Sequence, residues 1–299
     1  MPNAEMLAKI ERGDGFIAAL DQSGGSTPKA LQGYGIEDGD WSSDEEMFDL
    51  IHQMRSRIIT SPAFSSGKVL GAILFERTMD GTVDGKPTPQ ALIDIGVVPF
   101  IKIDKGLEPE ENGVQIMKPI PGLDELLERA RSLGVFGTKE RSVINQANMS
   151  GISVLVAQQF QVAKQVLSHG LMPIIEPEVN IKSADRADSD DLLLTAILEE
   201  LDEVPQGQQV MLKLSIPAEA GKFDALVDHP KVLKVVALSG GFSRAEACAE
   251  LARNPGMIAS FSRALLSDLR AQQSDEEFDR TLGTAIDEIY RASTSKVPA

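Results

Sequence analysis

The sequence predicts an α/β protein whose strands close into a (β/α)8 TIM barrel, and two observations support this fold class. Strand-like and helix-like stretches alternate along the 299 residues and give eight such units. Most of the strand-like stretches are short and apolar, as strands covered on both faces are. Alternating units form a parallel sheet, and eight of them close most simply into a barrel. A doubly wound open sheet is the alternative arrangement.

The strand candidates are apolar runs that lie between stretches with a helical pattern. In chain order they span residues 15–21, 69–75, 97–104, 135–141, 172–178, 209–215, 233–239 and 256–261. No Pro/Gly/Ser-rich linker, low-complexity tract or short-period repeat interrupts the series. We therefore expect one domain over residues 1–299, with an extra helix before the first strand and another after the last.

Helix candidates fill the intervals, and their ends carry recognisable signals. Apolar residues recur at helical spacing over residues 44–60, 152–168 and 192–202, a leading helix covers residues 4–12, and a last one begins near Asp275. Ser43 with Glu46 and Ser243 with Glu246 fit the spacing of a capping box. Three glycines are predicted to stop helices, namely Gly13, Gly134 and Gly170.

Composition and charge argue against several classes of function. A net charge of −16 at pH 7 would repel nucleic acid and anionic membranes, so we expect neither as a partner. The N-terminus lacks the pattern of a signal peptide, and no apolar run approaches a membrane span. Cys248 is the single cysteine, which favours the reducing cytoplasm. The oligomeric state stays open, and a homo-oligomer is compatible with the sequence.

Lys213 lies in the middle of the apolar strand candidate at residues 209–215. Lysine is among the residues least often fully buried, because an ammonium group loses its hydration there. A buried lysine can lose its proton, and a neutral amine attacks carbonyls to form a Schiff base. The alternatives are a lysine that snorkels from a strand edge or a structural ion pair.

Charged side chains recur where the predicted strands end. They are Asp21, Lys102, Asp104, Lys139, Arg141, Glu176, Glu178, Lys213 and Arg263. Catalytic residues of such barrels lie at the carboxyl ends of the strands, and side chains two apart on a strand share a face. One charged pair would commonly be a solvated strand end, but a series on successive strands predicts a functional ring. Its five cations against four anions suit an anionic substrate.

Two loops are predicted to bind phosphate at the end of the barrel, after the seventh and eighth strands. They are Ser239-Gly240-Gly241 and Ser260-Phe261-Ser262-Arg263. Glycine lets backbone N–H groups approach an oxyanion, serine adds a hydroxyl, and arginine adds a charged fork. A second phosphate candidate combines Ser23 and Ser26, before a helix that starts near Thr27, with Lys102. Ser26 as a plain helix cap is the alternative.

These motifs, taken in order, resemble the class I (Schiff-base) fructose-bisphosphate aldolases, in a short, bacterial-like form. The resemblance runs through all eight strand ends. The matching motifs are Ala18-Ala19-Leu20-Asp21 with the Ser23-Gly24-Gly25-Ser26 loop, Ile73-Leu74-Phe75-Glu76, Ile101-Lys102-Ile103-Asp104-Lys105-Gly106, Lys139-Glu140-Arg141, Pro173-Ile174-Ile175-Glu176-Pro177-Glu178, Leu212-Lys213, Leu238-Ser239-Gly240-Gly241 and Ser260-Phe261-Ser262-Arg263.

The resemblance implies a cytoplasmic lyase of glycolysis and gluconeogenesis that cleaves fructose 1,6-bisphosphate reversibly into dihydroxyacetone phosphate and glyceraldehyde 3-phosphate. It implies that Lys213 forms the Schiff base and that Glu176 is the acid/base for the water of the carbinolamine. It also implies that Asp21 is the carboxylate that acts on the C4 hydroxyl when the carbon–carbon bond breaks. Lys139 and Glu178 match residues that position and tune these groups.

The resemblance also assigns the substrate contacts. Arg141 resembles a cation that positions the substrate. The resemblance implies that the ketone-side phosphate binds to the loops that contain Ser239, Gly240, Gly241, Ser262 and Arg263. The other phosphate is then bound by Ser23, Ser26 and Lys102. The chain departs from the animal enzymes at Gln22, where an acid is usual, at Ser262, where glycine is usual, and in a short C-terminal tail without a tyrosine.

The expected chemistry requires neither a metal nor another cofactor, because an iminium on Lys213 is itself an electron sink. His52, His169 and His229 lie in a helix pattern, before a helix stop and in a loop, so we expect each to be structural. Two rival functions stay open: a Schiff-base aldolase for a related sugar phosphate such as tagatose bisphosphate, and a non-catalytic barrel that serves as a scaffold.

Overall fold

The computed structural model describes residues 3–298 and contains eight parallel strands that close into a TIM barrel. The strands lie in the order β1-β2-β5-β7-β8-β9-β10-β11. The barrel closes between the last strand and the first, where the N–H of Ala19 donates to the carbonyl of Phe261 at 3.1 Å. The predicted fold class is therefore confirmed, and the open-sheet alternative is wrong.

The strands agree closely with the predicted segments. Their bounds are β1 (Phe16–Leu20), β2 (Val69–Leu74), β5 (Val98–Lys102), β7 (Gly137–Ile144), β8 (Met172–Val179), β9 (Val210–Ser215), β10 (Val232–Leu238) and β11 (Ile258–Ala259), with a small hairpin of β3 (Thr82–Val83) and β4 (Lys86–Pro87) and the short β6 (Val114–Gln115). The sequence patterns missed β3, β4 and β6, because two-residue strands are too short to show a periodicity.

Three predicted strands end two or more residues away from the expected position, and the one predicted at 97–104 ends at Lys102. The strand predicted at 135–141 runs on to Ile144, because β6 pairs antiparallel with its far end and supplies hydrogen bonds there. Arg141 therefore lies within β7 and not at its end. The last strand is shorter than predicted, because β11 keeps register with β10 at two positions, Ile258 and Ala259.

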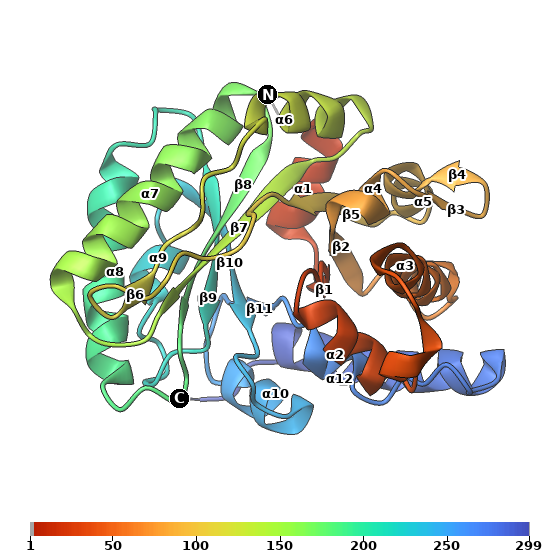
Figure 1. Cartoon of the computed structure of the whole chain (residues 1–299). Helices are drawn as coiled ribbons and strands as arrows, with labels where there is room; N and C mark the ends of the chain where they lie inside the picture. The colour runs from red at the N-terminus through yellow and green to blue at the C-terminus, as the bar shows by residue number, and fades with distance from the viewer. Residues whose placement is uncertain (1–2, 299) are drawn as a thin grey trace.

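The helices surround the barrel, with α7 and α8 on one side and α2, α3 and α12 on the other (Figure 1). Their bounds are α1 (Ala4–Arg12), α2 (Ser26–Gly33), α3 (Asp44–Thr60), α4 (Glu76–Met79), α5 (Thr88–Asp94), α6 (Leu123–Ser132), α7 (Met149–Ser168), α8 (Arg186–Asp202), α9 (Asp224–Val227), α10 (Arg244–Ala252), α11 (Arg263–Leu266) and α12 (Asp275–Thr294), plus a 3-10 turn at Asp38–Asp40. Among residues 3–298, none of the helices is long and apolar enough to cross a membrane.

The predicted helix signals mostly hold. Ser243 and Glu246 form the full capping box of α10, and Ser43 caps α3 through the N–H of Glu46. Gly134 and Gly170 follow their helices with φ of 82° and 73°, a conformation that favours glycine.

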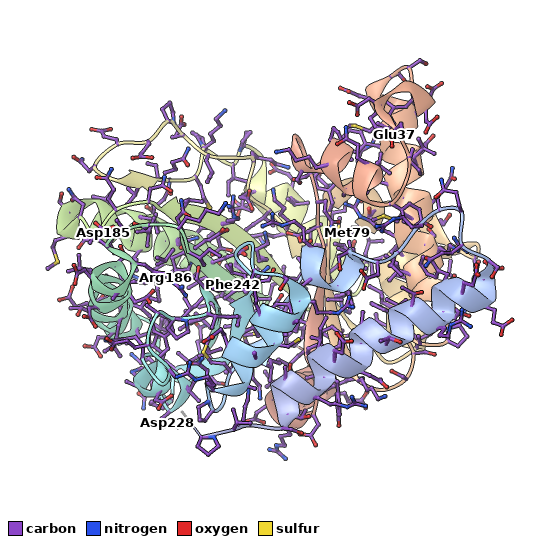
Figure 2. The ribbon with its side chains drawn as sticks, turned by 90° about the horizontal axis from the view of Figure 1, so that it is seen from below. Glu37, Met79, Asp185, Arg186, Asp228 and Phe242 are labelled. Atoms are coloured by element: carbon purple, nitrogen blue, oxygen red, sulfur yellow. The ribbon has the colours of Figure 1, made fainter. Side chains whose placement is uncertain are left out.

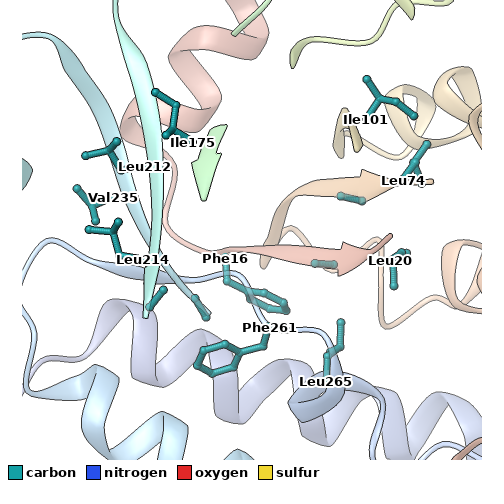
Figure 3. Close-up of a cluster of buried hydrophobic side chains, with 14 of the residues drawn as sticks. Phe16, Leu20, Leu74, Ile101, Ile175, Leu212, Leu214, Val235, Phe261 and Leu265 are labelled. Carbon is teal, nitrogen blue, oxygen red and sulfur yellow. The ribbon is translucent and has the colours of Figure 1, made fainter. Parts of the chain in front are cut away.

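Apolar side chains form two cores, one on each side of the barrel wall. The outer core lies between strands and helices and includes Phe16, Leu20, Phe261 and Leu265, which Figure 3 shows packed together. The inner core holds residues that alternate with these along the strands, such as Ile17. Ile10 of α1 belongs to the inner core, so the leading helix covers the amino end of the barrel.

Phe100 fills much of the inner core, and two neighbouring strands make room for it with glycine. A β-carbon at Gly71 would lie 3.0 Å from the Phe100 ring and one at Gly137 would lie equally close, while also meeting the Met172 carbonyl. Phe136 packs edge-on against Phe100, with ring centroids 5.4 Å apart. The amino half of the barrel interior is therefore apolar and closely packed.

Two residues beyond this apolar layer, on the same inward face of the strands, the side chains in the barrel interior become charged. Four strands repeat this change from an apolar residue of the inner core to a charged residue. The pairs, apolar residue first, are Ala19 and Asp21, Phe100 and Lys102, Ile174 and Glu176, and Met211 and Lys213. The period of two along a strand thus brings these charges together at the carboxyl end of the barrel.

Candidate active site

Lys213, in the middle of β9, is 4% exposed, so the expectation of a buried lysine is confirmed and a snorkelling lysine is wrong. Its Nζ lies 3.1 Å from Oε1 of Glu176, which is also buried. The ion-pair alternative from the sequence is therefore realised, but in the interior of the barrel, where solvent screens charges little. A buried amine with a carboxylate beside it can exchange a proton with that carboxylate.

Lys139 is the centre of the charge cluster. Its Nζ lies 2.7 Å from Asp21 Oδ2, 3.0 Å from Glu176 Oε2 and 3.9 Å from Asp104 Oδ2. Burial alone would lower the pKa of Lys139, but Asp21, Glu176 and Asp104 outweigh it and raise that pKa above its ordinary value. Glu176 therefore bridges two lysines, with one oxygen on each.

The carboxyl groups of this cluster are held in their ionised form. Burial favours a neutral carboxyl and would raise the pKa of Asp21, but the ammonium groups of Lys139 and Lys213 hold it well below its ordinary range. Burial also raises the pKa of Glu176, but Lys139 and Lys213 lower it by more, so its pKa lies below the ordinary value. Both carboxylates are thus available as proton acceptors.

Two more charged pairs extend the cluster. Lys102 Nζ lies 2.7 Å from Asp104 Oδ1 and also donates to the carbonyl of Asp104. The structure therefore ties Lys102 to Asp104, and within residues 3–298 Lys102 forms no hydrogen bond to the serine loop. Arg141 Nε donates to Glu178 Oε2 at 2.5 Å, across from β7 to β8. Lys102 is thus paired with Asp104 of its own segment, whereas Arg141 is paired between strands.

The loop after β10, which the sequence assigned to a phosphate, is a tight turn with two glycines. Gly240 and Gly241 have φ of 59° and 115°, which favour glycine, and the N–H of Phe242 closes the turn onto the carbonyl of Ser239. Arg263, after β11, is exposed, and its Nη2 would lie 3.7 Å from a β-carbon at Gly241. The guanidinium thus lies close to the glycine loop.

The loop after β1 is held by its own serines. Ser26 Oγ accepts from the N–H of Ser23 at 2.9 Å and donates to the Ser23 carbonyl at 2.7 Å. Gly25 precedes α2 and no side chain caps this helix, so the interpretation of Ser26 as a helix cap is wrong. Ser26 instead shapes the loop that the sequence assigned to a second phosphate.

Arg55 was not predicted from the sequence. It lies on α3 and is buried, and its guanidinium donates to Thr78 Oγ1 at 2.7 Å and to the carbonyl of Gln22 at 2.6 Å. Burial lowers the pKa of Arg55 to about 10. A signal did exist, since helical spacing places Arg55 on the apolar face of α3 with Ile51 and Ile58.

Glu140 is a second buried charge without a predicted role. It lies between Lys139 and Arg141 on β7, so its side chain points away from the barrel interior, toward the helices. Neither carboxylate oxygen has a hydrogen-bond partner among residues 3–298. Burial, assisted by the charge of Asp104, raises the pKa of Glu140 well above its ordinary value and so favours its neutral form.

The rim of the barrel mouth is tied together by Arg186 of α8. Its guanidinium donates to the carbonyl of Ile216, after β9, and lies 5.8 Å from the ring of Phe242, after β10. Figure 2 shows Arg186 and Phe242 close to one another. Arg186 thereby links the loop that follows Lys213 with the glycine loop.

The three histidines lie apart, each with a local partner: His52 with the carbonyl of Thr82, His169 with Asp124, and His229 with the N–H of Lys231. Residues 3–298 contain no group of three or more His, Cys, Asp and Glu side chains arranged to hold a metal ion.

Comparisons with solved structures agree with the fold. A fructose-bisphosphate aldolase from Plasmodium falciparum superposes with a TM-score of 0.78 at 21% identity, over 98% of this chain and 95% of that one. An archaeal fructose-1,6-bisphosphate aldolase, whose catalytic lysine is covalently bound to the carbinolamine intermediate of the substrate, superposes with a TM-score of 0.55 at 13% identity, over 96% of this chain and 98% of that one. At these identities the likeness establishes the barrel fold alone.

The comparison with protein families is more direct. A model described as fructose-bisphosphate aldolase class-I matches residues 3–216, which include the strands from β1 to β9 and therefore Asp21, Lys139, Glu176 and Lys213. Because this match spans more than half of the chain, the protein belongs to the class I fructose-bisphosphate aldolase family.

Proposed function

We propose that this protein is a metal-independent class I fructose-bisphosphate aldolase, which cleaves fructose 1,6-bisphosphate into dihydroxyacetone phosphate and glyceraldehyde 3-phosphate and also catalyses the reverse reaction. One observation carries the proposal: the Glu176 carboxylate bridges Lys213 and Lys139, and Lys139 in turn holds Asp21. This arrangement supplies an amine, a proton carrier and a second carboxylate inside one barrel, and the reaction requires these three groups.

The first half of the reaction makes the electron sink. Glu176 takes a proton from the Lys213 ammonium, and the free amine attacks the C2 carbonyl of the open-chain sugar. Glu176 then returns a proton to the carbinolamine hydroxyl, which leaves as water and yields an iminium between Lys213 and C2. The 3.1 Å distance between Lys213 Nζ and Glu176 Oε1 is within direct reach for the first transfer.

The second half breaks the carbon–carbon bond. Asp21 accepts the proton of the C4 hydroxyl, the C4–O bond becomes a carbonyl, and the C3–C4 electron pair moves into the iminium to give an enamine. Glyceraldehyde 3-phosphate leaves, and C3 takes up a proton from Glu176, Lys139 or bound water, while Asp21 gives up the proton it accepted. Water then hydrolyses the resulting iminium and releases dihydroxyacetone phosphate from Lys213. The lowered pKa of Asp21 supports its part, since only the ionised carboxylate can accept this proton.

Two separate loops support a substrate with two phosphates. We assign the ketone-side phosphate to Ser239, Gly240, Gly241, Ser262 and Arg263, and the other phosphate to Ser23, Ser26 and Lys102. Arg141, held by Glu178 at 2.5 Å, would position the chain of the sugar between the two loops. A bisphosphate aldolase of this kind connects hexose with triose phosphates, which is the step shared by glycolysis and gluconeogenesis.

A cleavage assay tests the proposal against its rivals. The purified protein is given fructose 1,6-bisphosphate or tagatose 1,6-bisphosphate, with and without EDTA, and the triose phosphates are measured. We expect cleavage of the fructose compound at a rate that EDTA leaves unchanged. Preference for the tagatose compound would move the assignment to a related aldolase, because the two sugars differ at C4. Absence of cleavage with either sugar would favour a scaffold.

A further inference from the structure

Gln22 joins the two loops that follow the first and the last barrel strands. Its Nε2 donates to Ser262 Oγ at 2.7 Å and to the carbonyl of Ala19 at 3.2 Å. Gln22 precedes Ser23 of one proposed phosphate loop, and Ser262 precedes Arg263 of the other. This side-chain contact, between residues 240 positions apart, therefore connects the two loops directly.

Arg55 fixes Gln22 from the other side. One guanidinium nitrogen, Nη2, donates to the Gln22 carbonyl at 2.6 Å and lies 3.3 Å from its Oε1, while Nη1 donates to Thr78 Oγ1. Because Arg55 holds Oε1, the amide must present its NH2 group to Ser262. Arg55 is 1% exposed, so its position is set by the packing of α3 against the barrel.

This arrangement also fixes the role of the Ser262 hydroxyl. A serine oxygen has two acceptor positions and one O–H donor. Gln22 occupies an acceptor position, and the O–H stays available to donate to an oxyanion. A carboxylate at position 22 would instead accept the hydrogen bond of that O–H. Glutamine at position 22 therefore leaves the Ser262 hydroxyl free to donate to the substrate.

We propose that Arg55, Gln22 and Ser262 form a clamp that sets the separation of the two phosphate loops and thereby selects bisphosphate over monophosphate sugars. This inference rests on the proposed function and names positioning residues for the same site. A substrate with phosphates at both ends gains full binding at both loops if their spacing is already correct. A substrate with one phosphate contacts one loop, so its binding does not depend on the distance between the two loops.

The clamp predicts a change in preference and not merely a loss of activity. The test compares kcat/KM for fructose 1,6-bisphosphate with that for fructose 1-phosphate in wild type, Gln22→Met, Ser262→Ala and the double variant. Methionine keeps the length of glutamine without its hydrogen bonds. We expect each single variant to lower the bisphosphate-to-monophosphate ratio about tenfold, as the loss of a positioning hydrogen bond would. The double variant should fall no further, because both changes break one contact.

Arg55→Lys keeps the charge but loses the planar fork, and it should lower the ratio in the same direction. Its matched control is Arg57→Lys on the same helix, since Arg57 donates to Gln273 and Asp275 and holds neither loop. Arg57→Lys should leave the ratio as in wild type. Thermal unfolding of each variant verifies that the barrel is intact.

An unchanged ratio in Gln22→Met and Ser262→Ala would overturn the clamp, as would independent, multiplicative losses in the double variant. Failure of the proposed function looks different. In that case the wild type itself would cleave neither sugar, whereas failure of the clamp leaves both sugars cleaved by every variant with the wild-type preference.

Discussion

Lys213 Nζ lies 3.1 Å from Glu176 Oε1 inside the barrel, where the two side chains are 5% and 4% exposed. The other oxygen of Glu176 lies 3.0 Å from Lys139. One carboxylate is thus shared by two ammonium groups, and a proton that leaves Lys213 has an acceptor whose charge is already stabilised. In this account Glu176 carries protons to and from Lys213, and Lys139 keeps Glu176 and Asp21 ionised.

Glu176→Gln should therefore slow cleavage of fructose 1,6-bisphosphate by at least about a hundredfold, in the range of general acid–base catalysis. Glutamine keeps the shape of the side chain but can no longer carry the proton. Glu178→Gln is the comparison, because Glu178 is paired with Arg141 and is assigned a positioning role without proton transfer. We expect a smaller loss in kcat for that variant. Equal losses in kcat would contradict the assignment of the proton carrier.

Glu140 gives a prediction about stability and pH. Its pKa is raised in the folded protein, so the folded state keeps a proton that the unfolded chain releases near pH 4.3. The stability from this neutral carboxyl is complete below that pH and is lost as pH rises through the folded pKa. The stability of Glu140→Gln relative to wild type, measured by urea unfolding, should thus increase as pH rises from 4 to 8.

Ser142→Ala is the control for this measurement, because Ser142 is buried on the same face of β7 and does not titrate. Its difference from wild type should be the same at both pH values. If Glu140→Gln shows the same difference at both pH values too, the carboxyl of Glu140 is not held neutral in the folded protein.

The strands and the charged inner face could be predicted from the sequence, because a period of two is a local property. Ala19 and Asp21, or Met211 and Lys213, reveal their common face without any tertiary information. The partners of these charges could not be predicted in the same way. Arg141 pairs with Glu178 because β7 and β8 are neighbours at that height, and Arg55 reaches Gln22 only after α3 packs on the barrel.

Arg263→Ala should weaken the use of fructose 1,6-bisphosphate about ten- to a hundredfold in kcat/KM. The reason is the loss of a charged hydrogen bond to phosphate, worth roughly 1.5–3 kcal/mol. A phosphate-free analogue should lose little. Arg270→Ala is a matched control, because Arg270 follows in the same segment and donates to the carbonyls of Ser267 and Leu269. Equal losses with both substrates would make Arg263 a structural residue.

The C-terminal tail is anchored at the end of the barrel opposite the site. Lys296 Nζ donates to the carbonyls of Leu251, Met257 and Ala292, and Met257 precedes β11 at the amino end of that strand. Deletion of residues 295–299 should lower the melting temperature. Cleavage and hydrogen exchange at C3 of dihydroxyacetone phosphate should stay within about threefold of wild type, or roughly 0.6 kcal/mol of barrier.

A fall in C3 exchange of about a hundredfold, with circular dichroism unchanged, would mean that the tail takes part in proton transfer. Lys296→Met serves as the companion variant. It removes the anchor but keeps the length of the chain, so it should show the lower melting temperature and normal exchange.

Borohydride reduction with peptide mapping tests the central assignment most directly. The protein is incubated with dihydroxyacetone phosphate or fructose 1,6-bisphosphate, reduced, digested, and analysed by mass spectrometry for the lysine that carries the sugar. We expect the adduct on Lys213, and we expect Lys213→Met to be folded, unlabelled and inactive in cleavage. An adduct on another lysine, or cleavage that Lys213→Met retains, would contradict the account.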